Sequence, residues 1–318
     1  MKSSIPLVLM ASLLATLKRA ILPTAAATET QQPFHFAANQ TSVNMPRAPV
    51  ICVSHGGGPM PILGDPEHEK LVKSMRERVP AILKLGTPEQ PRAIVLVTAH
   101  WSERNPTISN GQRHPLLYDY YGFPPESYKL KYDAPGAPDV ASEVAEALKA
   151  EGLKPEFDED RGWDHGVFIP MLLINPKADV PIVQMSVLRS EDPTEHFRMG
   201  QALSKLRDSN VAILGSGFPS LHNLRAMFSG MTQQPSFKSR NEAWSRAVNG
   251  AVAEENPEER RKKLDEWRKF PGAYDMHPRG GAEHFLPLIV CAGAAGEDKG
   301  KMYSDKYMGL DMFSYYWK

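Results

Sequence analysis

Short β-branched runs alternate with longer stretches of helical periodicity from Pro49 onward. Strand-like runs cover Val50 to Val53, Ala93 to Thr98, Ile182 to Val187 and Val211 to Leu214, and helical stretches lie near Glu67 to Lys84, Pro138 to Glu151 and Pro193 to Asp208. This alternation is typical of a parallel-dominated sheet with helices on both faces. The pattern therefore predicts an α/β fold with a mostly parallel central sheet.

A highly charged segment follows, from Lys238 to Arg268, and apolar positions such as Trp244 and Val248 are spaced through it. We expect two amphipathic helices with a break at Asn256-Pro257. Because charge on such helices usually forms a solvated face, the segment does not indicate a binding surface.

The first 46 residues differ from the rest. An apolar stretch from Ile5 to Leu17 is followed by Lys18 and Arg19, with no acidic residue before Glu29. The stretch is too short for a membrane span, so we expect no span in the mature domain. Three interpretations stay open: a secretory signal, an organelle-targeting peptide, or an extension without a targeting function on a cytoplasmic protein. The sequon at Asn39 matters only if the chain is secreted.

Composition excludes some partners. The 318 residues carry a net charge of zero with no basic block, so nothing indicates nucleic acid or an anionic membrane surface as a partner. The two cysteines, Cys52 in a predicted strand and Cys291 in a predicted helix, are expected to be buried apolar side chains. The sequence leaves the oligomeric state open.

Five histidines are the strongest candidates for chemistry. His55 and His100 each follow directly after a predicted strand. Ligands of open α/β sheets bind beyond the carboxyl ends of the strands, so these two imidazoles can converge there although 45 residues separate them. His165 stands in Asp-His-Gly, His222 follows the run that ends at Leu214, and His284 stands in Glu-His-Phe.

The glycine runs near these histidines favour close approach of a ligand to the backbone. Gly56-Gly57-Gly58 follows His55, and Gly215-Ser216-Gly217 precedes His222. The lack of Gly-Lys-Ser/Thr argues against a phosphate loop, and the missing Gly-x-Ser-x-Gly elbow argues against Ser216 as a nucleophile. His35, His68, His114 and His196 fit structural roles, and His277 is ambiguous. Since no local zinc signature is present, spacing alone leaves a metal site and a set of structural histidines both open.

The motifs around these residues resemble the DOPA 4,5-dioxygenase-like proteins of the class III extradiol ring-cleaving dioxygenases. The matching segments are Ser54-His55-Gly56, Ala99-His100-Trp101, Asp119-Tyr120-Tyr121-Gly122-Phe123-Pro124, Tyr132-Asp133-Ala134-Pro135-Gly136, Arg161-Gly162-Trp163-Asp164-His165-Gly166, Gly215-Ser216-Gly217, Leu221-His222-Asn223-Leu224 and Glu283-His284-Phe285-Leu286-Pro287-Leu288. They cover most of the chain from Pro49 to Gly296. The chain departs from the family in the triple glycine after His55, in a longer segment between His55 and His100, and in extra sequence at both termini.

The resemblance implies one α/β catalytic domain over residues 47–318 and a metal ion held by His55, His100 and a third ligand on the final helix. In this branch the implied ligand is His284, with Glu283 as the rival, because adjacent helical residues point about 100° apart. His222 is implied as a ligand or as the base that faces the substrate. Ferrous iron fits the chemistry, and zinc is a second occupant of the same site.

The implied reaction opens a catechol ring, that of DOPA or a related catechol, with O2 to give a semialdehyde. His222 takes the second hydroxyl proton and His165 donates a proton during O–O cleavage. Tyr120, Tyr121, Trp101 and Trp163 are candidate walls for the substrate, or simply packing residues. Two other classes remain: a zinc-dependent hydrolase with the same ligands, and a non-catalytic metal-binding protein like the related Memo proteins, for which degraded ligands are expected.

Overall fold

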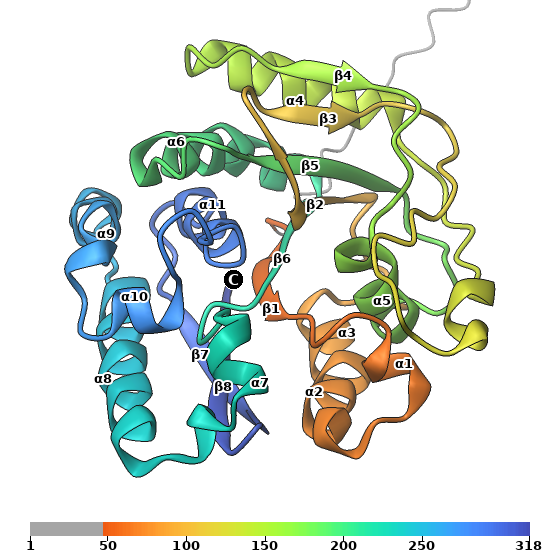
Figure 1. The fold of residues 1–318 in the computed structure, drawn as a ribbon. Coiled ribbons are helices and arrows are strands. Elements are labelled where there is room, and N and C mark those ends of the chain that lie inside the picture. Colours follow the sequence, from red (N-terminus) through yellow and green to blue (C-terminus); the bar gives the residue numbers. More distant parts are fainter. Residues whose placement is uncertain (1–46) are drawn as a thin grey trace, which may run out of the picture. The chain divides into compact units, whose positions relative to one another are not determined.

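Eight strands form one mixed sheet in the order β4-β3-β5-β2-β6-β1-β8-β7 (Figure 1). The computed structural model describes residues 47–318, so the predicted targeting segment, His35 and the Asn39 sequon lie outside the described residues. The strands are β1 (Val50–Ser54), β2 (Ala93–Glu103), β3 (Thr107–Ser109), β4 (Glu156–Asp158), β5 (Ile182–Leu188), β6 (Val211–Gly217), β7 (Lys301–Tyr307) and β8 (Leu310–Trp317).

The centre of the sheet is parallel. Strand β2 pairs in parallel with β5 and β6, and β6 pairs in parallel with β1. Every residue of β1, β5 and β6 is buried. These strands are covered on both faces, and this explains why their sequences are apolar runs without alternation. The predicted α/β fold with a mostly parallel sheet is confirmed.

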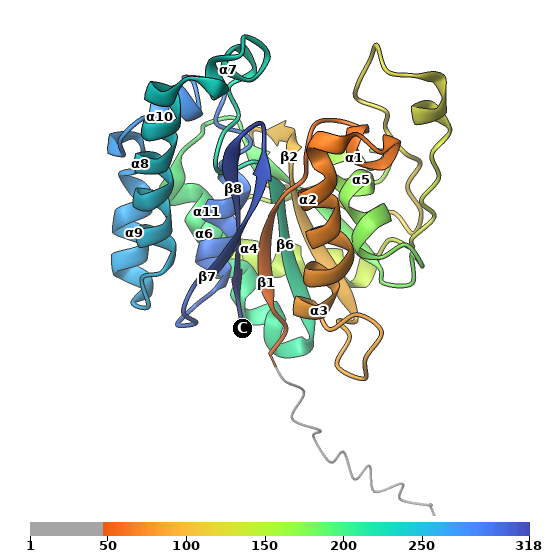
Figure 2. The same cartoon turned by 90° about the horizontal axis from the view of Figure 1, so that it is seen from below.

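Helices cover both faces of this sheet (Figures 1 and 2). Helices α4, α6, α8, α9 and α11 lie on one face, and α2, α3 and α5 lie on the other. Their bounds are α1 (Met60–Leu63), α2 (Glu69–Lys73), α3 (Val79–Ile82), α4 (Pro138–Ala150), α5 (His165–Ile174), α6 (Pro193–Ser204), α7 (Leu224–Phe228), α8 (Pro235–Val252), α9 (Pro257–Asp265), α10 (Ala273–Met276) and α11 (Leu286–Ala294). Within residues 47–318, no helix is long and apolar enough to cross a membrane.

The charged segment forms the predicted helix pair, α8 and α9. Asn256 caps α9, because its side-chain oxygen accepts hydrogen bonds from the backbone N–H groups of Glu258 and Glu259 at 3.0 and 3.1 Å. Trp244 and Trp267 turn inward and are buried. The break at Asn256-Pro257 is therefore where the sequence predicts it.

The carboxyl-terminal hairpin of β7 and β8 was not predicted. Strand β8 pairs antiparallel with β1, so that Val50 lies opposite Trp317. Met308 and Gly309 between the strands have φ angles of 51° and 75°, the left-handed conformations that tight hairpin turns require. The hairpin carries Tyr307 and Met308 to the same end of the sheet as His55.

Three predicted placements near the site need correction. His100 lies inside β2 rather than after it, where the pairing with β5 shifts register between Thr98 and Ser102. Such a bulge makes a side chain point in a different direction from the one that regular strand pairing would give it. Gly215 and Gly217 belong to β6 itself. His284 stands in a turn before α11, since that helix begins only at Leu286.

Candidate metal centre

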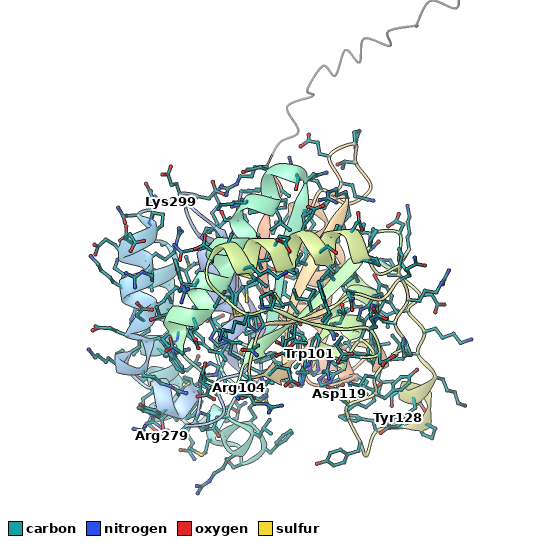
Figure 3. All side chains as sticks on the ribbon, turned by 90° about the horizontal axis from the view of Figure 1, so that it is seen from above. Trp101, Arg104, Asp119, Tyr128, Arg279 and Lys299 are labelled. Carbon is teal, nitrogen blue, oxygen red and sulfur yellow. The ribbon has the colours of Figure 1, made fainter. Side chains whose placement is uncertain are left out.

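The side chains of His55, His100 and His284 converge at the carboxyl end of the parallel strands. The Nε2 atom of His100 lies 3.3 Å from Nε2 of His55 and 3.2 Å from Nε2 of His284. The three ring centroids are 4.7 to 5.3 Å apart. Trp101 and Asp119 mark this end of the sheet in Figure 3, opposite the end at which Lys299 lies.

The hydrogen-bond partner of Nδ1 determines the tautomer of His55 and of His284. Ser216 Oγ donates its only hydrogen to the Gly166 carbonyl at 2.5 Å, so at 3.0 Å it accepts from Nδ1 of His55. In His284, Nδ1 donates to Glu283 Oε1 at 2.9 Å. Each Nε2 therefore carries a bare lone pair, the form in which a histidine binds a metal.

His100 has no such hydrogen bond, but its Nδ1 lies 3.6 Å from Asp119 Oδ2, and the negative charge of this carboxylate favours a proton on Nδ1. Three neutral Nε2 atoms cannot all hydrogen-bond to one another once each Nδ1 faces an acceptor. Their lone pairs point at a shared space and repel. A cation at that point would remove the repulsion, so the donor set fits a metal ion.

Burial keeps these imidazoles neutral. Burial lowers the pKa of His55 and of His284 well below the ordinary value, and the surrounding histidines lower it further. The pKa of His100 is lowered to about 3 for the same two reasons, against the opposing charge of Asp119. Histidines in this environment can offer lone pairs to a metal throughout the neutral pH range.

His165 begins α5 and faces the cluster from the other side. Asp119 holds it twice, because Oδ1 accepts from the His165 backbone N–H at 2.9 Å and from Nδ1 at 2.7 Å. Burial raises the pKa of the Asp119 carboxyl, but its bonds with His165 outweigh that effect and hold the pKa below the ordinary value. The Asp119 carboxylate thus fixes the orientation of the His165 ring.

His222 and His284 share one carboxylate. Their rings stack with centroids 3.3 Å apart, and Nδ1 of His222 lies 3.3 Å from the Glu283 oxygen that also accepts from His284. Burial raises the pKa of Glu283, but the bond with His222 outweighs it and leaves the pKa lowered. Glu283 therefore contacts two imidazoles. Glu283 and His284 both stand before α11, so the helical geometry expected from the sequence does not choose between them.

Two separate donor sets are compatible with an ion. The ligand atoms of His55, His100 and His165 lie within 4.8 Å of one another, and so do those of His222, Glu283 and His284. The first set forms a histidine triad fitted to a metal. All five candidate histidines thus come together in one cluster, from the position directly after β1, the β2 bulge, α5 and the segments before α7 and α11.

A cavity of about 1000 Å³ opens beside this cluster. Its walls include the five histidines, and Tyr120 and Tyr121 contribute to them as the sequence suggested. Trp101 and Trp163 do not line it, since both are buried in packing positions. The Trp101 ring instead supports the Arg161 guanidinium at 4.6 Å, and Nη2 of Arg161 donates to the His100 carbonyl at 3.1 Å.

The two glycine runs act differently. Gly56 and Gly58 have φ angles of 88° and 50°, so the backbone turns sharply after His55 and lines the cavity. Gly217 instead makes room for packing. A Cβ there would lie 2.4 Å from the His284 carbonyl oxygen. That oxygen accepts from the Phe218 N–H at 2.8 Å, which ties the His284 segment to the end of β6.

The remaining described histidines are structural. His114, His196 and His277 are buried and hydrogen-bonded to backbone groups. His68 accepts from the Gly57 N–H at 2.9 Å and contacts Asp65 at 2.5 Å, so it supports the glycine turn after His55. This resolves the ambiguity over His277, whose Nε2 bonds the Pro219 carbonyl at 3.0 Å.

Sequence reasoning assigned no role to Asp119 or Ser216 as supports of the histidines. Asp119 lies 46 residues from His165, and no local spacing links them. Ser216 was considered only as a nucleophile, although its position between two small residues at a strand end was a usable signal. Both contacts become visible only when the strand order is known.

Comparisons with known proteins agree with this geometry. The family model described as the catalytic LigB subunit of aromatic ring-opening dioxygenase matches residues 49–314. The dioxygenase tasH of Hapsidospora irregularis is 55% identical over 288 residues, 87% of each chain. The 4,5-DOPA dioxygenase extradiol of Beta vulgaris is 33% identical over 249 residues, 77% of this chain and 86% of the relative.

A solved structure gives the same result for the fold. The crystal structure of the uncharacterized protein JW3007 from Escherichia coli K12 matches with a TM-score of 0.66 and 28% sequence identity, covering 86% of this chain and 100% of that one. The family match spans nearly all of the described residues and includes every histidine of the cluster. The chain therefore belongs to the LigB family of class III extradiol, aromatic ring-opening dioxygenases.

Proposed function

We propose that this dioxygenase binds one ferrous ion through His55, His100 and His284 and opens a catechol ring beside the diol. The proposal rests on the convergence of three Nε2 atoms: that of His100 lies 3.3 Å from that of His55 and 3.2 Å from that of His284. In the reaction the carbon–carbon bond next to the diol breaks, and both atoms of O2 enter the product, which is a yellow semialdehyde. DOPA and related catechols are candidate substrates, since relatives carry the name 4,5-DOPA dioxygenase extradiol.

A bound ferrous ion supplies the electron transfer between ring and oxygen that no side chain can provide, whereas zinc has no second oxidation state. His222 accepts the second hydroxyl proton of the catechol. Its Nδ1 faces Glu283 at 3.3 Å, so Nε2 is the free acceptor for this proton. His165, paired with Asp119, returns a proton to oxygen as the ring opens.

The ligand assignment is tested by elemental analysis of purified variants reconstituted with ferrous iron without oxygen. We expect His55→Ala and His100→Ala each to lose stoichiometric metal, with His114→Ala as the control, because His114 lies outside the cluster. Full retention of metal in both variants would refute the assignment. Loss in Glu283→Ala together with retention in His284→Ala would replace His284 by the carboxylate.

The reaction is tested by oxygen uptake across a catechol panel with the iron-loaded protein. We expect uptake together with a yellow product, and no activity from the zinc-loaded protein without oxygen. Turnover of an ester or amide panel by the zinc form, with no oxygen uptake by the iron form, would favour a metal-dependent hydrolase. The intact histidine cluster argues against a non-catalytic protein of the Memo type.

A further inference from the structure

The cavity is larger than a simple catechol requires. Its volume of about 1000 Å³ lies at the upper end of the range of about 300–1,000 Å³ for sites that hold drug-sized ligands. A catechol with a short side chain, bound with its diol at the histidines, would leave most of this space unfilled. The remaining volume can hold a larger substituent on the ring.

Apolar side chains surround the unfilled part. Phe123, Phe218 and Met227 line the cavity. At its mouth stand two aromatic side chains that are almost fully solvent-exposed: Tyr121, with 91% exposed, on the loop after Asp119, and Phe228, with 82% exposed, at the end of α7. Large exposed aromatics from separate segments around one cavity are typical of a surface that contacts a ligand.

The charge of the lining selects against an anionic substituent. Among the described residues that line the cavity there is no lysine or arginine, whereas Asp65, Glu67 and Asp119 are acidic. Arg104 and Arg279 lie at the same end of the molecule (Figure 3), but neither lines the cavity. A carboxylate brought into this space would lose hydration without gaining a cationic partner.

We infer that, among the candidate catechols, the cavity favours one with a bulky apolar substituent and no carboxylate beside the ring over a free amino-acid catechol such as DOPA. This inference rests on the proposed function for the diol end. The substituent lies against Phe123, Phe218 and Met227, and Tyr121 and Phe228 close over its outer part.

Binding is measured first, by calorimetry on the full-length zinc-loaded protein, in which no ring cleavage occurs. The probes share one catechol: dihydrocaffeic acid, its N-methyl amide and its N-benzyl amide. We expect the benzyl amide to bind most tightly and the acid most weakly, with about a tenfold or greater difference in Kd between these two. Equal or tighter binding of the acid overturns the inference.

Variants then locate the substituent. Phe228→Ala and Tyr121→Ala should each reduce the preference for the benzyl amide over the acid severalfold. Phe157→Ala is the matched control, because Phe157 is an exposed aromatic residue on β4 that does not line the cavity. An unchanged preference in both rim variants contradicts the assignment of these two residues.

Oxygen uptake by the iron-loaded protein with the same probes separates the two proposals. If no probe supports uptake while the benzyl amide still binds best, the proposed function fails and the inference about the cavity stands. If the acid has the highest kcat/KM, the proposed function stands and the inference fails. Highest kcat/KM for the benzyl amide supports both.

Discussion

At the scale of single residues, the site depends on what each imidazole does with its second nitrogen. His55 is fixed by Ser216, His165 by Asp119, and His284 by Glu283. These partners leave the opposite nitrogen free to bind a metal or move a proton, and they also hold each ring in place. The hydrogen-bond partners thus determine which ring nitrogen of each of these three histidines is free for chemistry.

His222 is the residue whose role can be tested most directly. The His222→Phe variant keeps an aromatic ring that can stack on His284 but removes the proton acceptor. We expect ring-cleavage turnover to fall by about 10²-fold or more, the usual contribution of a positioned base. Metal content measured on the same sample shows whether His222 is also a ligand. Turnover within a few-fold of the parent would mean that the proton leaves by another route.

At the scale of elements, close packing between β6 and the segment before α11 places His284. The backbone of that segment approaches Gly217 so closely that a methyl group would meet the His284 carbonyl oxygen at 2.4 Å. In a close-packed interior such an overlap has to be relieved by backbone movement. The position of His284 therefore depends on the absence of a side chain in a neighbouring strand.

The Gly217→Ala variant should lose stability by about 1–3 kcal/mol, the usual cost of overpacking, and should bind metal more weakly. Urea unfolding and metal titration measure the two effects. Gly250→Ala is the matched control: a Cβ at Gly250 meets nothing within 4 Å, and the residue lies inside α8. There alanine should stabilise the protein by up to about 1 kcal/mol. Unchanged metal affinity in Gly217→Ala would show that packing does not position His284.

The sequence predicts long, uniform elements best. The runs that became β1, β5 and β6 were visible because burial on both faces requires continuous apolar residues. The three-residue strands β3 and β4 are too short to show a pattern, and β7 is only partly buried and mixes charged with apolar residues. The missed bulge at His100 reflects pairing with a distant strand, which local sequence does not encode.

The same limit applies to the site. The five histidines could be identified because each stands beside glycine, a strand end or an acidic residue. The partners Asp119 and Ser216 could not, since their contacts span 46 and 161 residues. For Trp101 and Trp163 the packing alternative holds, because both are buried. The motif alone does not show whether such an aromatic residue faces the core or the cavity.

At the scale of the whole molecule, stability should fall in acid because buried histidines fold in the neutral form. His196 is an example outside the site. It accepts from the Leu188 N–H at 2.9 Å and donates to the Asp192 carbonyl at 2.6 Å, and burial lowers its pKa to about 4. Between that value and the unfolded value near 6.5, the unfolded chain binds more protons, so the free energy of unfolding decreases as pH falls.

The His196→Gln variant should remove part of this dependence, because glutamine can accept and donate the same two hydrogen bonds without titrating. We expect the loss of unfolding free energy between pH 7 and pH 4.5 to be smaller in the variant by about 2 kcal/mol. Urea unfolding of both proteins at the two pH values measures the difference. Equal losses would indicate that His196 is already protonated in the folded protein or that it titrates normally.

The central claim is that the histidine cluster supports dioxygenation of a catechol, and labelled oxygen gas tests it most directly. The iron-loaded protein is supplied with 18O2 and the best-binding catechol, while oxygen uptake and product mass are recorded together. We predict one O2 consumed per ring opened and both labelled atoms in the product, apart from aldehyde oxygen lost by exchange with water. Ring opening in which the label comes from water, or no oxygen uptake with any catechol, would contradict the account.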